Sequence, residues 1–252
     1  MQLGILFQFS MLVFIGLIFI NELIRRTKNK ASMLRKTAII TRLPLMLLIF
    51  FPRSEAGLDG DSIYHLIFLA IFLIYYLASP IIYPTINQFL KNTYRHENFG
   101  RLYSNATSIN KVVMLVVTFA YGWWLDIDPY AFTWVYPAIA IIGVASVHLL
   151  SKIPYTDKDI VIKKSFKQAV IDSMNRMVQL MSNNKPYLHF EIGFMLYGFA
   201  WLSTIAVIAI YFVNVLDLNY TSVAFYKNGY NIIAIIILPY FGRLLGKIDP
   251  RK

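Results

Sequence analysis

The feature that most constrains this chain is a series of long apolar runs separated by short charged stretches. A helix that crosses a bilayer needs about 20 mostly apolar residues, because the hydrocarbon core is roughly 30 Å thick. An all-α bundle of about seven membrane-spanning helices is therefore predicted. The expected spans are Gln2–Leu23, Thr37–Phe51, Ile63–Ile86, Asn105–Leu125, Tyr130–Ser151, His189–Val213 and Thr221–Phe241. The short second run contains Arg42 and Pro44, and Pro80 and Pro84 could bend the third run.

The composition fits a chain surrounded by lipid. Hydrophobic residues make up 58% of the chain and charged residues 15%, whereas soluble domains contain roughly 25% charged residues. The net charge of +11 does not indicate nucleic-acid binding, because the basic residues lie between apolar runs and not along one soluble face. We therefore expect the lipid bilayer, and no nucleic acid, as a partner.

The residue patterns of soluble enzyme sites are missing from the sequence. There is no cysteine, which excludes disulfides and thiolate metal sites. The histidines are scattered without metal-ligand spacing, and neither a nucleophile elbow nor a phosphate-binding loop is present. We predict no cofactor, no metal and no enzymatic activity.

Basic residues are distributed very unevenly among the connections. Of the 24 lysines and arginines, 20 lie after the first, third, fifth and seventh runs. The opposite side has only Arg53 and Lys227, and Lys227 lies near the start of the seventh run. Because cytoplasmic loops are enriched in basic residues, the amino terminus is predicted outside and the carboxy terminus in the cytoplasm. The expected location is the cell (inner) membrane, with the chain as a multi-pass integral protein.

The longest polar connection covers residues 152–188. Within it, apolar residues recur at three- and four-residue spacing from Phe166 to Met181, and basic residues accompany them. This pattern predicts an amphipathic helix that lies on the anionic cytoplasmic leaflet. A partly ordered linker with chance periodicity is the alternative.

The carboxy-terminal stretch fits part of a G-x-L-x-D-R-x-G-R-K pattern. Matching residues lie at or close to four positions: Gly242, Leu244, Lys247 and Arg251. Gly246 replaces the acid of the pattern, and Asp249 replaces its second glycine. In these residues the stretch resembles a loop signature of the major facilitator superfamily. A basic helix end that only fixes orientation is the alternative reading.

Two further stretches are similar to loops of the same superfamily. At the end of the first run, Arg26 and Lys30 match the signature, and after the third run Arg95, Gly100 and Arg101 resemble an R-x-x-x-x-G-R pattern. The arginines of the second stretch could equally be interfacial anchors. The resemblance implies that these residues, with those of the carboxy-terminal stretch, belong to cytoplasmic gating loops.

The repeated signature also implies an organisation in two bundles. Residues 1–151 would hold helices two to six of a twelve-helix carrier, 152–188 the linker, and 189–252 the first helices of the second bundle. The remaining helices would then be partners of this chain. The resemblance implies a secondary transporter that moves a small solute by alternating access, incomplete in this chain. A seven-helix receptor and a membrane scaffold without transport are the alternatives.

Five residues within the apolar runs are candidates for lining a substrate path: Arg42, Tyr76, Tyr121, Tyr197 and Trp201. A charge in lipid costs roughly 2.5–3.5 kcal/mol on insertion scales, so an intramembrane arginine is a functional candidate. Membrane anchoring or helix packing is the favoured alternative for Arg42, and an interfacial belt or packing role for the aromatic residues. The sequence does not specify the substrate.

Overall fold

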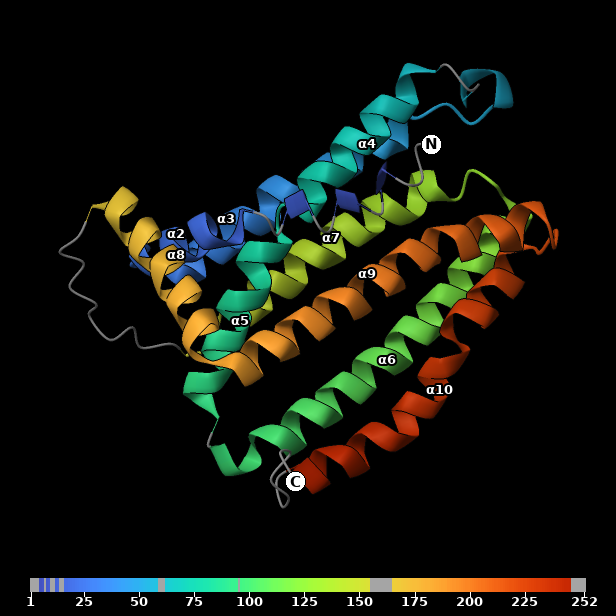
Figure 1. Cartoon of the computed structure of the whole chain (residues 1–252). Helices are drawn as coiled ribbons and strands as arrows, with labels where there is room; N and C mark the ends of the chain where they lie inside the picture. Colours follow the sequence, from blue (N-terminus) through green and yellow to red (C-terminus); the bar gives the residue numbers. More distant parts are fainter. Residues whose placement is uncertain are drawn as a thin grey trace. The chain divides into compact units, whose positions relative to one another are not determined.

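The computed structural model describes residues 5–6, 8–9, 12–13, 16–58, 62–94, 96–154 and 165–245. Every regular element in this part of the chain is helical (Figure 1). The α-helices are α2 (Leu17–Arg26), α3 (Lys30–Arg42), α4 (Ile63–Tyr76), α5 (Ser79–Thr93), α6 (His96–Ile127), α7 (Phe132–Leu150), α8 (Phe166–Asn183), α9 (Lys185–Asn214) and α10 (Tyr220–Leu245). Two 3-10 helices, η1 (Leu43–Phe50) and η2 (Glu55–Leu58), follow α3.

The helices divide into two compact units. The first comprises Met1–Asn87 and Tyr136–Ile208, and the second Gln88–Val135 and Ala209–Lys252. This division interleaves segments from before and after the long connection. The division into two sequential bundles, which comes from the sequence alone, stays a prediction.

In the first unit, the second expected span is the later part of a longer helical stretch. α3 begins at Lys30 because Asn29 caps it, with its side-chain oxygen accepting a hydrogen bond from the Ser32 amide at 2.8 Å. The geometry changes to the 3-10 form of η1 at Leu43. Pro44 explains the change, because its ring nitrogen cannot donate to the carbonyl of Ile40 one α-turn earlier.

The third expected span is broken into two helices. Ser62 caps α4, and the chain turns at Leu77 and Ala78 before α5 begins at Ser79. Pro80 lies in the first turn of α5, where a missing backbone donor is tolerated. The expected bend is therefore present as a helix break just before Pro80, whereas Pro84 lies inside α5.

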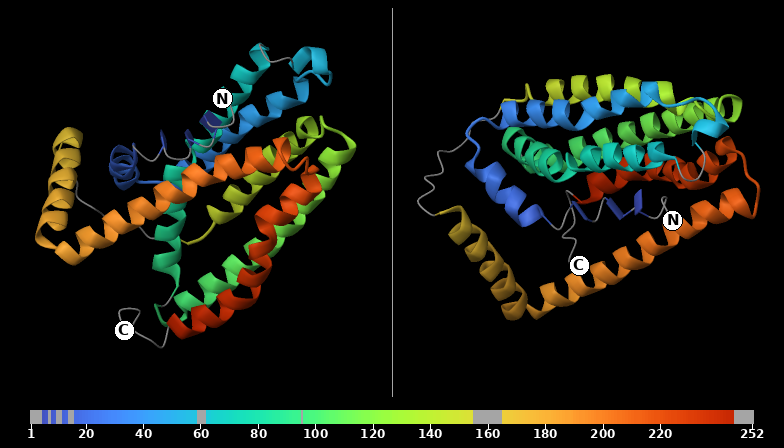
Figure 2. Two further views of the ribbon diagram at one scale, coloured as in Figure 1. Left: turned by 45° about the vertical axis from the view of Figure 1, so that its right-hand side comes forward. Right: turned by 90° about the horizontal axis from the view of Figure 1, so that it is seen from above.

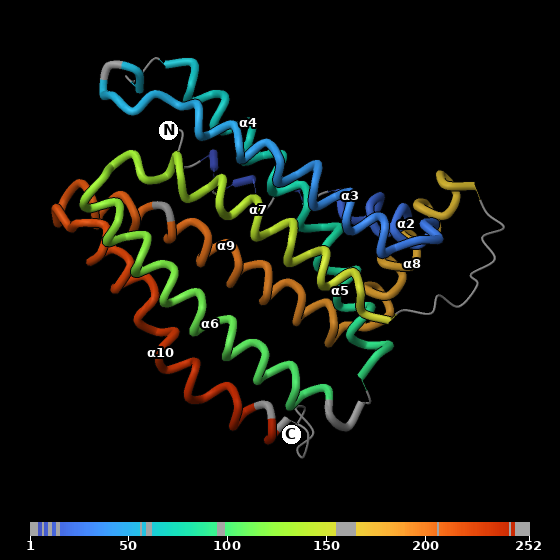
Figure 3. Tube along the Cα trace, turned by 180° about the vertical axis from the view of Figure 1, so that it is seen from behind, coloured from blue at the N-terminus to red at the C-terminus, as the bar shows by residue number. Residues whose placement is uncertain are grey.

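An aromatic cluster packs α4 against its neighbours within the first unit. η1 and α4 lie side by side (Figure 3). The ring of Phe72 meets that of Tyr136 on α7 edge-on, with 5.1 Å between the ring centroids. The ring centroid of Phe68 lies 4.5 Å from that of Phe72. Phe51, directly after η1, meets Tyr64 at 5.2 Å. Edge-to-face pairs of this kind stabilise packing beyond the burial of their area.

The second unit is dominated by the packing of α6 against α10. Both helices run side by side along most of their length (Figure 2). The two helices approach closely at Gly122, where a Cβ atom would lie 3.0 Å from the carbonyl oxygen of Tyr220 and 3.3 Å from Cβ of Ala224. Glycine permits this separation because it has no side chain. Phe119 and Phe225 pack edge-on one turn further, at 6.1 Å.

Four stretches of the described chain are long and apolar enough to cross a membrane: Ile63–Thr93, Phe99–Ile127, Phe132–Leu150 and Lys185–Asn214. They correspond to the third, fourth, fifth and sixth expected spans. The first expected span lies partly outside the described residues, the second corresponds to α3 with η1, and the seventh to α10. The chain is an all-α membrane helix bundle.

The connection between α7 and α9 contains α8, which covers most of the segment expected to be amphipathic. Only Ala169 and Val170 of this helix are buried, whereas Met174, Met177 and Leu180 are exposed. α8 packs against α2 within the first unit. Its position on a membrane surface stays a prediction.

Candidate functional site

Arg42, one of the substrate-path candidates, lies at the junction of α3 and η1 and extends to α7. A Cβ atom at Gly143 would lie 2.6 Å from Nε of Arg42 and 2.7 Å from its Cδ. The arginine side chain therefore lies directly on the backbone of α7, in space that any larger residue would occupy. Gly143 was not singled out from the sequence, because nothing local distinguishes it from a glycine with open surroundings.

The aromatic ring of Tyr75 lies beside the guanidinium. The Arg42 Cζ atom lies 5.8 Å from the ring centroid of Tyr75, within the range of a cation–π interaction. The Tyr75 ring in turn lies 5.9 Å from that of Tyr76, a second substrate-path candidate. The first unit thus brings Arg42 and Tyr76 into one cluster, with Tyr75 between them.

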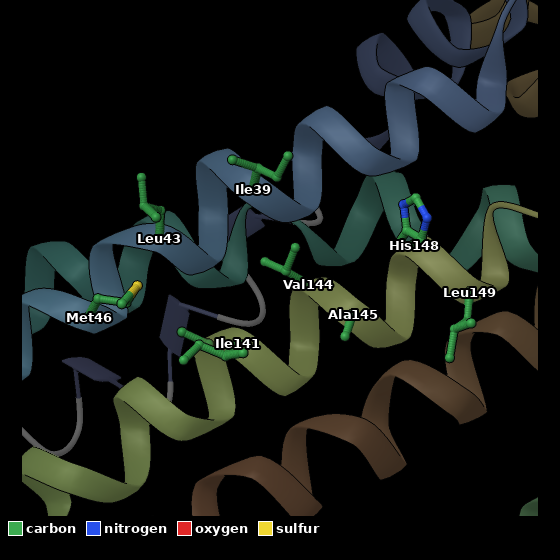
Figure 4. Close-up of a pocket in the computed structure, with 9 residues that line it drawn as sticks. Ile39, Leu43, Met46, Ile141, Val144, Ala145, His148 and Leu149 are labelled. Carbon is green, nitrogen blue, oxygen red and sulfur yellow. The ribbon is translucent and has the colours of Figure 1, made fainter.

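An apolar groove lies along the same pair of helices (Figure 4). It has a volume of about 590 Å³ and is lined by Ile39, Leu43, Met46, Ala140, Ile141, Val144, Ala145, His148 and Leu149. Leu43 follows Arg42 in sequence, Ile39 lies three positions before Arg42, and Val144 follows Gly143. The helices that hold Arg42 therefore present mainly hydrocarbon around it.

The other substrate-path candidates lie elsewhere. Tyr197 and Trp201 stack on each other along α9 at 6.4 Å, and their exposed fractions are 63% and 51%. No described interaction joins them to Arg42. Tyr121 lies on α6 in the second unit and is half-buried.

The first copy of the loop signature is joined to the linker helix. Nε of Arg26 donates to Oε1 of Glu22 at 2.7 Å, and Arg25 lies 2.8 Å from the same carboxylate. The Arg26 guanidinium also lies over the ring of Phe166 at the start of α8, 5.5 Å from its centroid. Lys30 is almost completely buried at the start of α3. Glu22 was not predicted as a partner, although its spacing four residues before Arg26 is typical of a helical ion pair.

The remaining loop candidates are less fully described. Gly100 and Arg101 lie on α6, with Arg101 exposed. Gly242 lies near the end of α10. Arg95, Lys247 and Arg251 lie outside the described residues.

The second unit contains a hydrogen-bonded junction that the sequence did not suggest. The carboxylate of Asp126, at the end of α6, accepts hydrogen bonds from the amides of Tyr220 and Thr221 at 2.7 and 3.0 Å. The Thr221 hydroxyl donates to the same carboxylate. Asp126 thus caps the first turn of α10, whose amides have no partner within the helix.

Buried polar groups lie further along these two helices. Asn231 on α10 is completely buried, and its side-chain nitrogen donates to Oδ1 of Asn228 at 3.1 Å. Its own Oδ1 is buried without a hydrogen-bond partner in the described chain, as is Oγ of Ser108 on α6. The ammonium of Lys111 lies 5.3 Å from the ring centroid of Tyr230. Lys111 is therefore held against α10 rather than turned away from it.

No group of three or more histidine, aspartate or glutamate side chains in the described ranges lies close enough together to hold a metal ion.

A comparison with protein families identifies the chain over its whole length. The family model described as "Major Facilitator Superfamily" matches residues 1–252. No curated protein and no solved structure matches the chain. The family match agrees with the bundle of apolar helices and with the loop signatures of the sequence. The chain belongs to the major facilitator superfamily of membrane transporters.

Proposed function

We propose that this chain is part of a secondary carrier that moves a small solute through the cell membrane by alternating access. Membership of a transporter family supports transport in general. In alternating access, two bundles rock around a site near the middle of the membrane, so that the site opens to one side at a time. The bundles would be residues 1–151 and 189–252, with the linker between them.

The observation that supports this mechanism best is the junction between α6 and α10. α6 precedes the linker and α10 follows it, so the two helices come from different proposed bundles. They pack along most of their length, and Asp126 joins them at one end through three hydrogen bonds from Tyr220 and Thr221. With the carboxy terminus in the cytoplasm, as predicted, the end of α6 and α10 that contains Asp126 faces outside. The junction would then hold the carrier closed to the outside.

The gating loops would act at the opposite end. Gly242 lies near the end of α10, Lys247 and Arg251 come after it in the sequence, and Arg26 follows the first expected span. All four would therefore lie on the predicted cytoplasmic side. The contact of Arg26 with Glu22 and Phe166 supports a link between the first loop and the linker helix. Movement of the linker would therefore be coupled to the end of α2.

Further helices of the same carrier would complete the second bundle. Consecutive residues of α9 are exposed, with Phe194 61%, Met195 69% and Leu196 66% accessible. Because consecutive residues of a helix point in different directions, α9 has uncovered sides that additional helices could pack against. The sequence of the gene beyond both ends of this chain would test this, since five more apolar spans in frame are expected.

A reversible crosslink tests alternating access. Replacing Asp126 and Thr221 by cysteine in this cysteine-free chain creates a pair that oxidation can join, because the two native side chains are in hydrogen-bond contact. Uptake of labelled sugars, amino acids, carboxylates and phosphates would be measured in proteoliposomes that contain the carrier. We expect oxidation to abolish uptake and a reductant to restore it.

Two outcomes would contradict the proposal. Equal uptake by the oxidised and reduced pair would show that the junction does not open during transport. If no solute in the panel enters even with the unmodified carrier, a receptor or a scaffold becomes the better interpretation. The single variants Asp126→Cys and Thr221→Cys are the controls, because neither can form the crosslink.

A further inference from the structure

Arg42 is a charged group inside the first unit whose charge is not neutralised within the described chain. It forms no described ion pair, in contrast to Arg25 and Arg26, which both pair with Glu22. NH1 of Arg42 is buried and has no hydrogen-bond partner among the described residues. Its one described interaction is with the face of Tyr75.

The position of the side chain does not fit a membrane anchor. An anchoring arginine extends toward the end of its helix, where the charge reaches the headgroups. Arg42 instead crosses to Gly143 on α7. Gly143 lies seven positions before the end of α7 at Leu150, which corresponds to about 10 Å at 1.5 Å per residue. The guanidinium is thus held two turns inside the helix end.

This arrangement is costly without a further partner. A charged side chain within the bilayer is unfavourable, and so is a buried hydrogen-bond donor without an acceptor. A cation–π contact recovers only part of these two costs. The neighbouring surface of α3, η1 and α7 is mainly hydrocarbon and offers little compensation.

We propose that the Arg42 guanidinium binds an oxyanion, a carboxylate or a phosphate group, on the solute that the carrier transports. That the bound anion is transported rests on the proposed function, whereas its binding at Arg42 rests on the geometry alone. Gly143 provides the space in which the side chain lies, and Tyr75 holds the guanidinium from its face. The substrate class of the carrier is then a small organic or inorganic anion.

The chemistry of the guanidinium favours this class of ligand. Its planar set of N–H donors matches the two oxygens of a carboxylate or phosphate, and charge-assisted hydrogen bonds of this type are roughly twice as strong as neutral ones. An ammonium group has the same charge without the planar fork. Arg42→Lys should therefore retain insertion but weaken anion binding.

Binding can be measured without knowledge of the native solute. The purified chain in phosphatidylcholine nanodiscs would be heated in sodium chloride, sodium phosphate or sodium succinate at equal ionic strength. A ligand that binds only the folded state raises the midpoint of thermal unfolding. We expect phosphate or succinate to raise it by at least about 2 °C relative to chloride.

Four variants locate the effect. Arg42→Gln removes the guanidinium, and Gly143→Ala leaves the charge but places a methyl group where Nε and Cδ of Arg42 now lie. Both should lose the rise in the midpoint. Arg35→Gln removes an exposed arginine on α3, and Gly193→Ala adds a methyl group where no atom lies within 4 Å. Both controls should keep it.

Results that differ from these expectations would overturn the assignment of Arg42 as an anion-binding residue. No rise with either anion in the unmodified chain, or an equal rise in Arg42→Gln, would show that Arg42 does not bind a soluble oxyanion. Nanodiscs that contain phosphatidylglycerol provide a further arm. If only the anionic lipid stabilises the protein, and only when Arg42 is present, the ligand is a lipid headgroup and the solute assignment is wrong.

The outcome is separable from that of the crosslinking experiment. Anion-dependent stabilisation does not require transport, so it can be present in a chain that moves nothing. Conversely, a carrier of uncharged solutes would show reversible inhibition by the Asp126–Thr221 crosslink and no effect of phosphate or succinate on stability.

Discussion

Asp126 and Thr221, which are 95 positions apart in the sequence, are joined by two hydrogen bonds, one from the amide and one from the hydroxyl of the threonine. The aspartate thereby acts as the amino-terminal cap of a helix to which it does not belong. A cap supplied by another helix fixes the position of one helix end relative to the other. This differs from the caps at Asn29 and Ser62, which lie directly before their own helices.

The first prediction is that this pair is energetically coupled. Asp126→Ala should lower the free energy of unfolding by about 0.5–2 kcal/mol, the usual cost of losing a cap. In a double-mutant cycle, Asp126→Ala and Thr221→Ala together should cost less than the sum of the single changes. Thr107→Ala is the matched control, because that exposed threonine on α6 bonds only to the carbonyl of Tyr103. Additive costs for Asp126 and Thr221 would contradict the coupling.

The second prediction concerns the close approach of α6 and α10. Gly122→Ala would bring a methyl group to 3.0 Å from the Tyr220 carbonyl oxygen, so the helices must separate or shift. Overpacking of this kind typically costs about 1–3 kcal/mol. Gly229→Ala on α10 meets no atom within 4 Å and should leave stability unchanged or slightly raised. Thermal unfolding in detergent would compare the two, and equal midpoints would argue against tight packing at Gly122.

The contacts of Asp126 with Thr221 and of Gly122 with Tyr220 could not be predicted from the sequence. Local signals were sufficient for the third to sixth apolar spans, for the bend near Pro80 and for the helix α8. The Asp126–Thr221 junction has no local signal, because its partners meet only when α6 and α10 pack. The same holds for Arg42: the sequence placed a charge in an apolar run, but its contact with Gly143 depends on how α3 and α7 cross.

The third prediction is the orientation of the chain in the membrane. Single cysteines at Ser54 and Val215, both exposed beside predicted outer connections, should react with an impermeant thiol reagent added to intact cells. Cysteines at Ser32 and Ser165 should react only after the membrane is opened. Ser54 is preferable to the nearby Gly57, where a Cβ atom would lie 2.5 Å from Cβ of Pro52. Reaction at Ser165 from outside would reverse the topology.

The fourth prediction places α8 on the membrane surface. A peptide of residues 163–181 should gain helical circular dichroism with phosphatidylglycerol vesicles and much less with phosphatidylcholine vesicles, because the basic residues supply part of the binding. A peptide with Lys163, Lys164, Lys167 and Arg176 changed to glutamine is the matched control and should not distinguish the two lipids. Coil spectra with both kinds of vesicle for the native peptide would reject the surface position.

The last prediction concerns the loop signature that follows α10. If Lys247 and Arg251 hold the cytoplasmic ends of the bundles together in one state of the cycle, they must act through their charge. Four positions apart on a helical continuation of α10, they would share one face and could reach one carboxylate or one helix carboxy terminus. Removing both charges should then affect transport more than insertion.

Lys247→Gln with Arg251→Gln should therefore reduce uptake at least about tenfold, which corresponds to roughly 1.4 kcal/mol, while abundance in the membrane stays normal. The matched control, Lys91→Gln with Lys152→Gln, removes the same charge from other predicted cytoplasmic positions. Orientation should survive in both variants, because most cytoplasmic basic residues remain. Equal uptake by the two double variants would leave anchoring as the role of the signature, since a gating contact depends on which charges are removed and an anchor depends only on how many.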